Sequence, residues 1–202
     1  MNTQEQLWAG DFGKDYIARN KGPNISASAL GFLARCLSKA PGVRSVLELG
    51  ANIGINLDAL AHLYPEATQT AVEINADACR ALRKYPKREV FQQSLLDFDG
   101  NGRLWDLVLI KGVLIHIAPE NIERAYQIIN RCSRRYALIA EYFNPVPVAV
   151  RYRDQEHALW KRDFAAELMD RCEGWECAEY GFVWERDPMP QDNINWWLLE
   201  RR

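Results

Sequence analysis

Residues 46–54 read Val46-Leu47-Glu48-Leu49-Gly50-Ala51-Asn52-Ile53-Gly54, and this stretch decides the fold. The run from Ser45 to Leu49 is short, mostly apolar and without helical periodicity, as is typical of a buried strand. After Gly54, apolar residues recur at helical spacing as far as Leu63. The stretch therefore predicts a strand, a tight glycine-containing loop and a helix.

The loop between this strand and this helix is suited to binding a ligand. Backbone N–H groups are unpaired at a helix start, and glycine lets a ligand approach the main chain closely. A dinucleotide would place its pyrophosphate here, but Glu48 lies two residues before the first glycine and would repel a phosphate. A carboxylate at this point suits S-adenosylmethionine, which carries positive charge and hydroxyls but no phosphate. The alternative is an ordinary turn of an α/β protein.

The loop resembles motif I of the class I S-adenosylmethionine-dependent methyltransferases, usually written acid-x-G-x-G-x-G. Asn52 replaces the middle glycine. Asparagine is the residue other than glycine that best tolerates a positive φ, so the backbone turn can survive the change. The resemblance implies a Rossmann-like class I methyltransferase fold.

A second acid strengthens the prediction of a nucleoside site. Residues 69–74 are predicted as the next strand, followed by Asn75 as the N-cap of a helix over 76–84. Glu73 ends this strand, 23 positions after Gly50. In Rossmann-type sheets an acid about 20 residues after the first glycine accepts hydrogen bonds from ribose hydroxyls. Two acids at successive strand ends therefore favour a nucleoside ligand.

The rest of the chain alternates between predicted strands and helices. Further strands are predicted at 90–93, 105–111, 136–142, 175–184 and 194–200, and further helices at 26–40, 120–132 and 160–171. Regular alternation specifies a parallel sheet with helices on both faces. No helix separates the last two strands, so they are expected to form an antiparallel hairpin at the sheet's edge. The expected architecture is α/β, with a mostly parallel seven-stranded sheet and an antiparallel C-terminal hairpin.

The N-terminal residues 1–25 are predicted to form a helical cap, and residues 26–202 a single methyltransferase domain. Trp8, Phe12 and Tyr16 recur every four residues, although glycines interrupt the helix. A mostly polar segment with such aromatics suits a lid that closes over the cofactor. The alternative is a solvated arm with one docked face.

Composition excludes several classes of partner. The formal charge is −2 and basic residues are scattered, which leaves no electrostatic footprint for nucleic acid. No apolar run approaches the ~20 residues of a membrane-spanning helix, and the first residues lack the features of a signal peptide. We therefore expect a cytoplasmic protein with no membrane partner. Five cysteines without a C-x-x-C pair argue against a zinc site, so no metal is expected.

The resemblance to class I methyltransferases implies positions for the cofactor. Ser94 and Leu95 lie in the loop that flanks the adenine, and the segment after Lys111 faces the methionine part. The expected cofactor-binding residues are Tyr16, Arg19, Glu48, Gly50, Ala51, Asn52, Gly54, Asn56, Glu73, Ile74, Ser94, Leu95, Lys111 and Gly112.

The acceptor site is predicted on residues 142–163, which leave the fifth strand at its carboxyl end, where open α/β sheets bind ligands. Methyl transfer is an in-line displacement, so the protein must position the acceptor and remove its proton. The expected catalytic residues are Tyr142 and Asn144 for orientation, Lys161 or Arg162 for an acidic group, and His116 or His157 as base. The alternatives are a solvated loop held by salt bridges and a structural role for His116.

Further stretches resemble one small clade, the pseudaminic-acid-biosynthesis-associated methylases. They are residues 8–13, 48–54, 141–145, 161–164 and 180–183. The resemblance implies transfer of methyl from S-adenosylmethionine to an oxygen or nitrogen of a small polar acceptor, such as a nonulosonic-acid-type sugar, with S-adenosylhomocysteine as product. Two other functions stay open: a nucleoside-binding regulatory or scaffold protein, and an enzyme that uses S-adenosylmethionine for non-methyl chemistry. The oligomeric state is not predicted.

Overall fold

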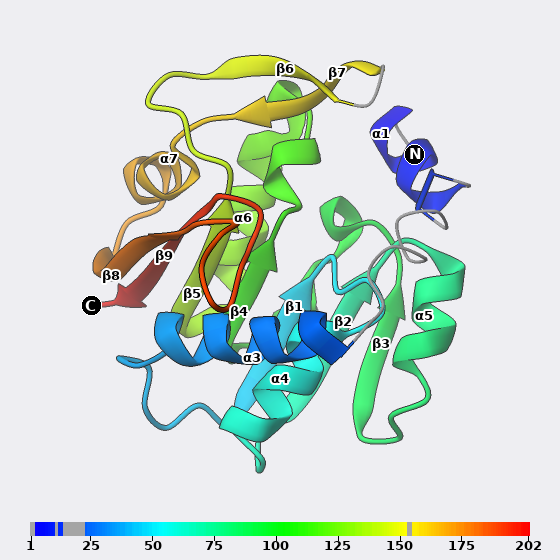
Figure 1. Cartoon of the computed structure of the whole chain (residues 1–202), viewed down its shortest axis with the longest axis vertical. Coiled ribbons are helices and arrows are strands. Elements are labelled where there is room, and N and C mark those ends of the chain that lie inside the picture. The colour runs from blue at the N-terminus through cyan, green and yellow to red at the C-terminus, as the bar shows by residue number, and fades with distance from the viewer. Residues whose placement is uncertain (1–2, 11, 14–22, 153–154) are drawn as a thin grey trace.

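The computed structural model describes residues 3–10, 12–13, 23–152 and 155–202 (Figure 1). The helices are α1 (Thr3–Ala9), α3 (Pro23–Cys36), α4 (Ile55–Leu63), α5 (Ala76–Leu82), α6 (Ile122–Cys132) and α7 (Phe164–Arg171). The strands are β1 (Ser45–Leu49), β2 (Thr68–Glu73), β3 (Arg88–Gln92), β4 (Trp105–Lys111), β5 (Ser133–Glu141), β6 (Val148–Tyr152), β7 (Gln155–Lys161), β8 (Trp175–Val183) and β9 (Ile194–Arg201).

The main sheet has seven strands in the order β3-β2-β1-β4-β5-β9-β8. The first five are parallel, and β9 pairs antiparallel with both β5 and β8. The expected mostly parallel sheet with an antiparallel C-terminal hairpin is therefore confirmed. Because parallel strands end at the same edge, β1, β2, β4 and β5 bring their carboxyl ends together.

Helices cover both faces of the sheet, as expected. Alternate residues of each strand point to opposite sides, so Leu47 and Leu49 pack with α6 and α7, whereas Val46 packs with α3 and α4. Figure 1 shows α3 and α4 in front of the sheet and α6 behind it. The two apolar clusters on these faces fix the strands, and with them the loops at their carboxyl ends.

The segment after β5 differs from the prediction. No strand was predicted between the fifth strand and the helix expected at 160–171, but β6 and β7 form a separate antiparallel hairpin there. Helix α7 begins only at Phe164, and Asp163 caps it by accepting a hydrogen bond from Ala166 N at 3.0 Å. The predicted helix therefore began four residues too early, at Trp160, which belongs to β7. Leu159 is buried in the cluster with α6 and α7, on a strand that contacts the 3-10 helix Leu114–His116.

Two other boundaries also differ. Helix α3 begins at Pro23 and not at Ser26, consistent with the preference of proline for the first helical turn. Strand β5 begins at Ser133 and not at Tyr136. The first residues of β5 are polar, so the apolar pattern does not include them. In the structure they pair with neighbouring strands: Arg134 with Asp106 at 3.1 Å and Arg135 with Glu200 at 3.0 Å.

Candidate active site

A cavity of about 560 Å³ lies at the carboxyl ends of β1, β2 and β4. Its floor is the loop between β1 and α4, where Gly50 and Gly54 have φ of 78° and 92° and Asn52 has φ of 47°. Asparagine therefore adopts the left-handed conformation expected for it. At Gly50 a Cβ would lie 2.5 Å from Val113 Cγ2, so the loop is packed against the segment after β4 and requires glycine there.

Glu48 lies beneath this loop and does not line the cavity. Its Oε1 accepts a hydrogen bond from Asn56 Nδ2 at 2.7 Å, and its Oε2 is buried with no partner in the described part of the chain. Burial raises the pKa of this carboxyl to about 8, although Asn56 and Lys111 oppose the shift. Asn56 itself lines the cavity, so Glu48 acts on the site by holding Asn56.

Glu73 lines the cavity at the end of β2 and organises two backbone segments. Its Oε2 accepts a hydrogen bond from Asn52 N, and its Oε1 accepts one from Asn75 N, both at 2.7 Å. Burial raises the pKa of Glu73, and the amide N–H groups of Asn75 and Asn52 counteract it. The carboxylate therefore faces the ligand side of the cavity while it fixes the glycine loop.

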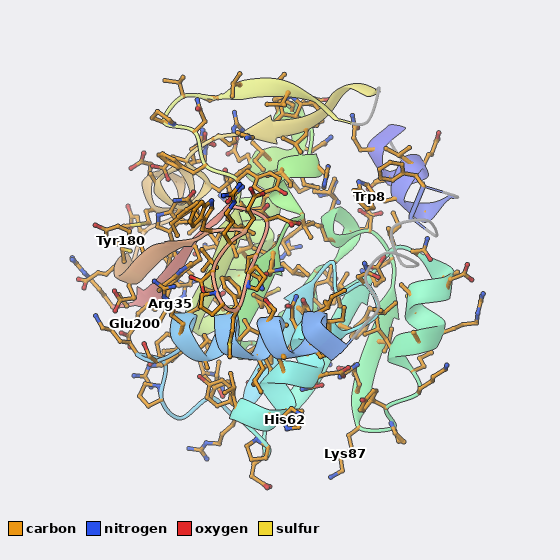
Figure 2. The ribbon with its side chains drawn as sticks, in the orientation of Figure 1. Trp8, Arg35, His62, Lys87, Tyr180 and Glu200 are labelled. Atoms are coloured by element: carbon orange, nitrogen blue, oxygen red, sulfur yellow. The ribbon has the colours of Figure 1, made fainter. Side chains whose placement is uncertain are left out.

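Helix α1 closes one side of the cavity. Asn75 Nδ2 donates a hydrogen bond to Trp8 O at 3.1 Å, and Ser94 Oγ donates one to Glu5. The ring of Trp8 lies 4.6 Å, between centroids, from the ring of His116. Residues of α1 thus contact the ends of three strands that are distant in sequence. Figure 2 shows Trp8 on the inner side of α1, turned toward the sheet.

The segment after β4 forms an adjoining side. Gly112 has φ of 64°, and the chain then turns through the 3-10 helix Leu114–His116. Glu141, at the end of β5, holds this turn because its Oε1 accepts hydrogen bonds from Val113 N at 2.9 Å and Leu114 N at 2.8 Å. Burial raises the pKa of Glu141 to about 7 against these amides.

The structure brings together most of the predicted site residues. The predicted residues that line the cavity are Gly50, Ala51, Asn52, Asn56, Glu73, Ile74, Ser94, Leu95, Lys111, Gly112, His116 and Tyr142. Glu48 and Gly54 support the loop without lining the cavity. Tyr16 and Arg19 lie outside the described residues, as does the side chain of His157.

Three predicted acceptor residues do not line the cavity in the structure. The side chain of Asn144 donates a hydrogen bond to Val146 O at 2.6 Å on an exposed turn. Arg162, which directly follows β7, pairs with Glu167 of α7 at 3.3 Å in a structural contact. Lys161 lies over the ring of Tyr142, with Nζ 5.3 Å from the centroid. The hairpin therefore reaches the cavity through Tyr142, while these three side chains serve the hairpin's own packing.

Sequence reasoning missed several residues that line the cavity: Gln4, Glu5, Asn75, Gln93, Gln191 and Asp192. Asn75 directly follows one predicted strand and Gln93 ends another, so their positions at strand ends were a usable signal. Gln191 and Asp192 come from the connection between β8 and β9, where no local pattern marks a contact across the molecule. Among the residues that the structure describes, no cluster of three or more metal-ligating side chains occurs, and no helix is long and apolar enough to cross a membrane.

Comparison with curated proteins finds no significant match to this sequence. A family model described as a methyltransferase domain matches residues 46–135, from the beginning of β1 into β5. The matched range contains the glycine loop, Glu73, Ser94 and Lys111, and so most of the expected cofactor side of the cavity.

Solved structures share the fold at low sequence identity. One is 1,6-didemethyltoxoflavin-N1-methyltransferase of Burkholderia thailandensis, solved with 1,6-didemethyltoxoflavin and S-adenosylhomocysteine; it has a TM-score of 0.75 at 15% identity over 96% of this chain and 87% of that chain. Another is magnesium protoporphyrin IX methyltransferase from Synechocystis PCC 6803 with bound S-adenosylmethionine, with a TM-score of 0.71 at 14% identity over 100% and 99%. Mitomycin 7-O-methyltransferase MmcR has a TM-score of 0.71 at 15% identity over 100% of this chain, which spans only 61% of MmcR.

At these identities the likeness establishes the fold, which is that of class I methyltransferases. The matched domain, the fold and the cavity over the glycine loop together define the class of protein. The family match over residues 46–135 and the fold support the predicted enzyme class, a methyltransferase. S-adenosylhomocysteine and S-adenosylmethionine are bound in two of these structural neighbours.

Proposed function

We propose that this enzyme methylates an oxygen or nitrogen of a small polar metabolite, and that the acceptor is a nonulosonic-acid-type sugar or a related intermediate. The observation that carries this proposal is a cavity of about 560 Å³, a size that suits a nucleoside cofactor and a small acceptor. The compounds for which two structural neighbours are named, 1,6-didemethyltoxoflavin and magnesium protoporphyrin IX, are also small molecules. A cytoplasmic location and the absence of a nucleic-acid or membrane partner remain predictions.

The residues of the cavity fit S-adenosylmethionine. Glu73 offers carboxylate oxygens at the strand end where a ribose is bound in Rossmann-type sheets. Ser94 and Leu95 line the neighbouring strand end, where we place the adenine. The bound cofactor would supply an electrophilic methyl group. Gly50 and Gly112, at the ends of β1 and β4, leave room for its reactive end between them.

Tyr142 and His116 are the best-placed residues to act on the acceptor. Both line the cavity near the end of β4 and β5, and His116 is largely buried beneath Trp8. A tyrosine hydroxyl can orient a hydroxylated acceptor, and a histidine can accept its proton as the methyl group is transferred. We therefore propose the predicted roles for Tyr142 and His116, whereas Asn144, Lys161 and Arg162 would act only by supporting the hairpin and the start of α7.

The first test measures binding and transfer directly. Purified protein should bind S-adenosylhomocysteine in a calorimetric titration and should produce it from S-adenosylmethionine when N-acetylneuraminate or related sugar acids are supplied. Binding without transfer to any sugar, but with transfer to another small polar compound, would refute the sugar assignment and keep the enzyme class.

Tyr142→Ala is expected to reduce turnover at least about tenfold, or about 1.4 kcal/mol of transition-state stabilisation. Cofactor affinity should stay within about twofold of wild type, because Tyr142 is placed on the acceptor side. The matched control is Tyr180→Ala, which removes a tyrosine that is 71% exposed on β8. Normal turnover by Tyr142→Ala with the true acceptor would move the acceptor site away from the hairpin.

Helix α1, within the predicted cap of residues 1–25, is proposed to be a lid over the bound cofactor. It joins the body through Trp8, which contacts Asn75 and His116, and through Glu5, which contacts Ser94. Trp8→Ala is expected to weaken S-adenosylhomocysteine binding about three- to tenfold without unfolding the protein, since only part of the Trp8 surface is buried. Isothermal titration and thermal melting check this, and equal affinity would show that α1 is only a docked arm.

A further inference from the structure

Strand β8 forms one edge of the main sheet, at its rim in Figure 1. Within the described part of the chain it pairs with β9 alone, so its other side has no partner strand. An open edge of this kind is a template for pairing with a further strand. No residue of β8 lines the cavity, so the stretch Tyr180-Gly181-Phe182-Val183, one of those that resemble the methylase clade, has no part in the active site.

The first half of β8 is protected against further pairing. A bulge between Cys177 and Glu179 interrupts the regular ladder with β9. Lys39 donates a hydrogen bond to Ala178 O at 3.4 Å and pairs with Glu179 at 2.6 Å. Bulges and lysine side chains are devices by which natural edge strands avoid association with other chains. Residues 175–179 are therefore poorly suited to receive another strand.

The second half of β8, residues 180–183, lacks these devices. The segment contains no charged residue and no proline, and its register with β9 is unbroken. Gly181 would weaken an ordinary strand, but here Trp196 of β9 packs directly over it, since a Cβ at Gly181 would lie 2.8 Å from Trp196 Nε1. Residues 180–183 are therefore a regular, uncharged strand edge that is open to pairing.

Two aromatic side chains are exposed along this open half. Tyr180 is 71% exposed and Phe182 is 47% exposed. Side chains alternate along a strand, so both lie on the face opposite to Val183, which is buried in the cluster with α3. Figure 2 shows Tyr180 on the opposite side of the view from Trp8, which closes the cavity. Exposed aromatic residues beside an open strand edge are typical of a surface that binds another protein.

We propose that β8 pairs antiparallel with β8 of a second copy of this chain through residues 180–183, which joins two seven-stranded sheets into one continuous sheet. A strand that pairs with its own copy about a two-fold axis brings the same segment opposite itself, and like charges there would repel. The uncharged segment 180–183 meets this requirement, which favours a second copy over a charged partner. The same axis keeps Tyr180 and Phe182 of both copies on one face, where they form cross-strand aromatic pairs.

Analytical ultracentrifugation tests the pairing. Wild-type protein should sediment with twice the mass of one chain in the micromolar range. Phe182→Lys places a positive charge opposite the same charge of the second copy, so the dissociation constant of the dimer should rise at least about tenfold. Leu104→Lys is the matched control, because Leu104 is 44% exposed and lies in the loop before β4; this variant should remain a dimer. Unchanged far-ultraviolet circular dichroism shows that both variants are folded.

Amide hydrogen exchange identifies the paired segment. In wild-type protein, exchange in residues 180–183 should be slower above the dissociation constant than below it, because pairing supplies acceptors for the outward-facing amides. Phe182→Lys should remove this dependence on concentration. Wild-type protein that is monomeric throughout the micromolar range overturns the proposal, as does a dimer that Phe182→Lys leaves intact. A dimer in which exchange at 180–183 is independent of concentration also overturns it, because the interface then lies elsewhere.

Discussion

Glu73→Ala is expected to weaken cofactor binding by about 1.5–3 kcal/mol, the range for a lost hydrogen bond to a charged group. The variant also removes the acceptor for Asn52 N and Asn75 N, so the glycine loop and the start of α5 lose their common anchor. Leaving buried amides unpaired costs about 1–3 kcal/mol for each group. The loss of affinity should therefore be accompanied by a lower melting temperature of the free protein.

Calorimetric titration with S-adenosylhomocysteine measures the first effect, and thermal melting measures the second. Glu73→Gln is the informative companion, because its remaining carbonyl oxygen can serve one of the two amides but carries no charge. Glu66→Ala is the matched control, since Glu66 is exposed in the loop before β2. Unchanged affinity in Glu73→Ala would mean that the ribose is bound elsewhere.

Glu141→Ala should produce the largest loss of stability. The carboxylate accepts hydrogen bonds from Val113 N and Leu114 N, and it is fully buried. Removing it leaves two buried donors without an acceptor, at about 1–3 kcal/mol each. Denaturant unfolding should show this loss, and Glu141→Gln should recover much of it because the amide oxygen can still accept both hydrogen bonds. A Glu141→Ala variant as stable as wild type would show that the turn after β4 is held by other contacts.

Wild type and Glu141→Gln can also be compared as a function of pH. The pKa of Glu141 is raised from its ordinary value of 4.5 to about 7, so the folded state holds this proton more tightly than the unfolded state does. Wild-type stability relative to Glu141→Gln should therefore fall as pH rises from about 5 to about 8. Stability that rises over this range relative to the glutamine variant would contradict the direction of the shift.

Local patterns predicted the main sheet well, because each strand carries its own evidence. Apolar runs such as 105–111 are buried on both faces of the sheet. Such a strand can be recognised from its own composition, because that composition does not depend on which strand it pairs with. The acids at successive strand ends were similarly visible, since Rossmann-type spacing places Glu73 beside the first glycine loop. The strands and the acids at their ends were therefore predictable from nearby residues and from one general rule of topology.

Contacts between distant segments were not visible in this way. Residues 142–163, predicted as the acceptor segment, are largely a hairpin, whose β6 strand follows a proline-containing turn and whose partner strand contains polar residues. The bond between Ser94 and Glu5 joins residues 89 positions apart, and nothing near either residue indicates the other. Asn144 and Arg162 were assigned to the acceptor from residue type alone, and the direction of a side chain depends on tertiary packing that residue type does not specify.

The position of β9 has a consequence for how the protein is made. This strand follows every other strand in the sequence, yet it lies between β5 and β8 in the sheet. While the nascent chain still lacks β9, β5 presents an open edge with the apolar residues Leu138 and Ile139, and β8 has no partner. Such edges favour association with other chains. Synthesis on the ribosome must therefore reach Arg201 before the sheet can close and the connection carrying Asp192 can complete the cavity.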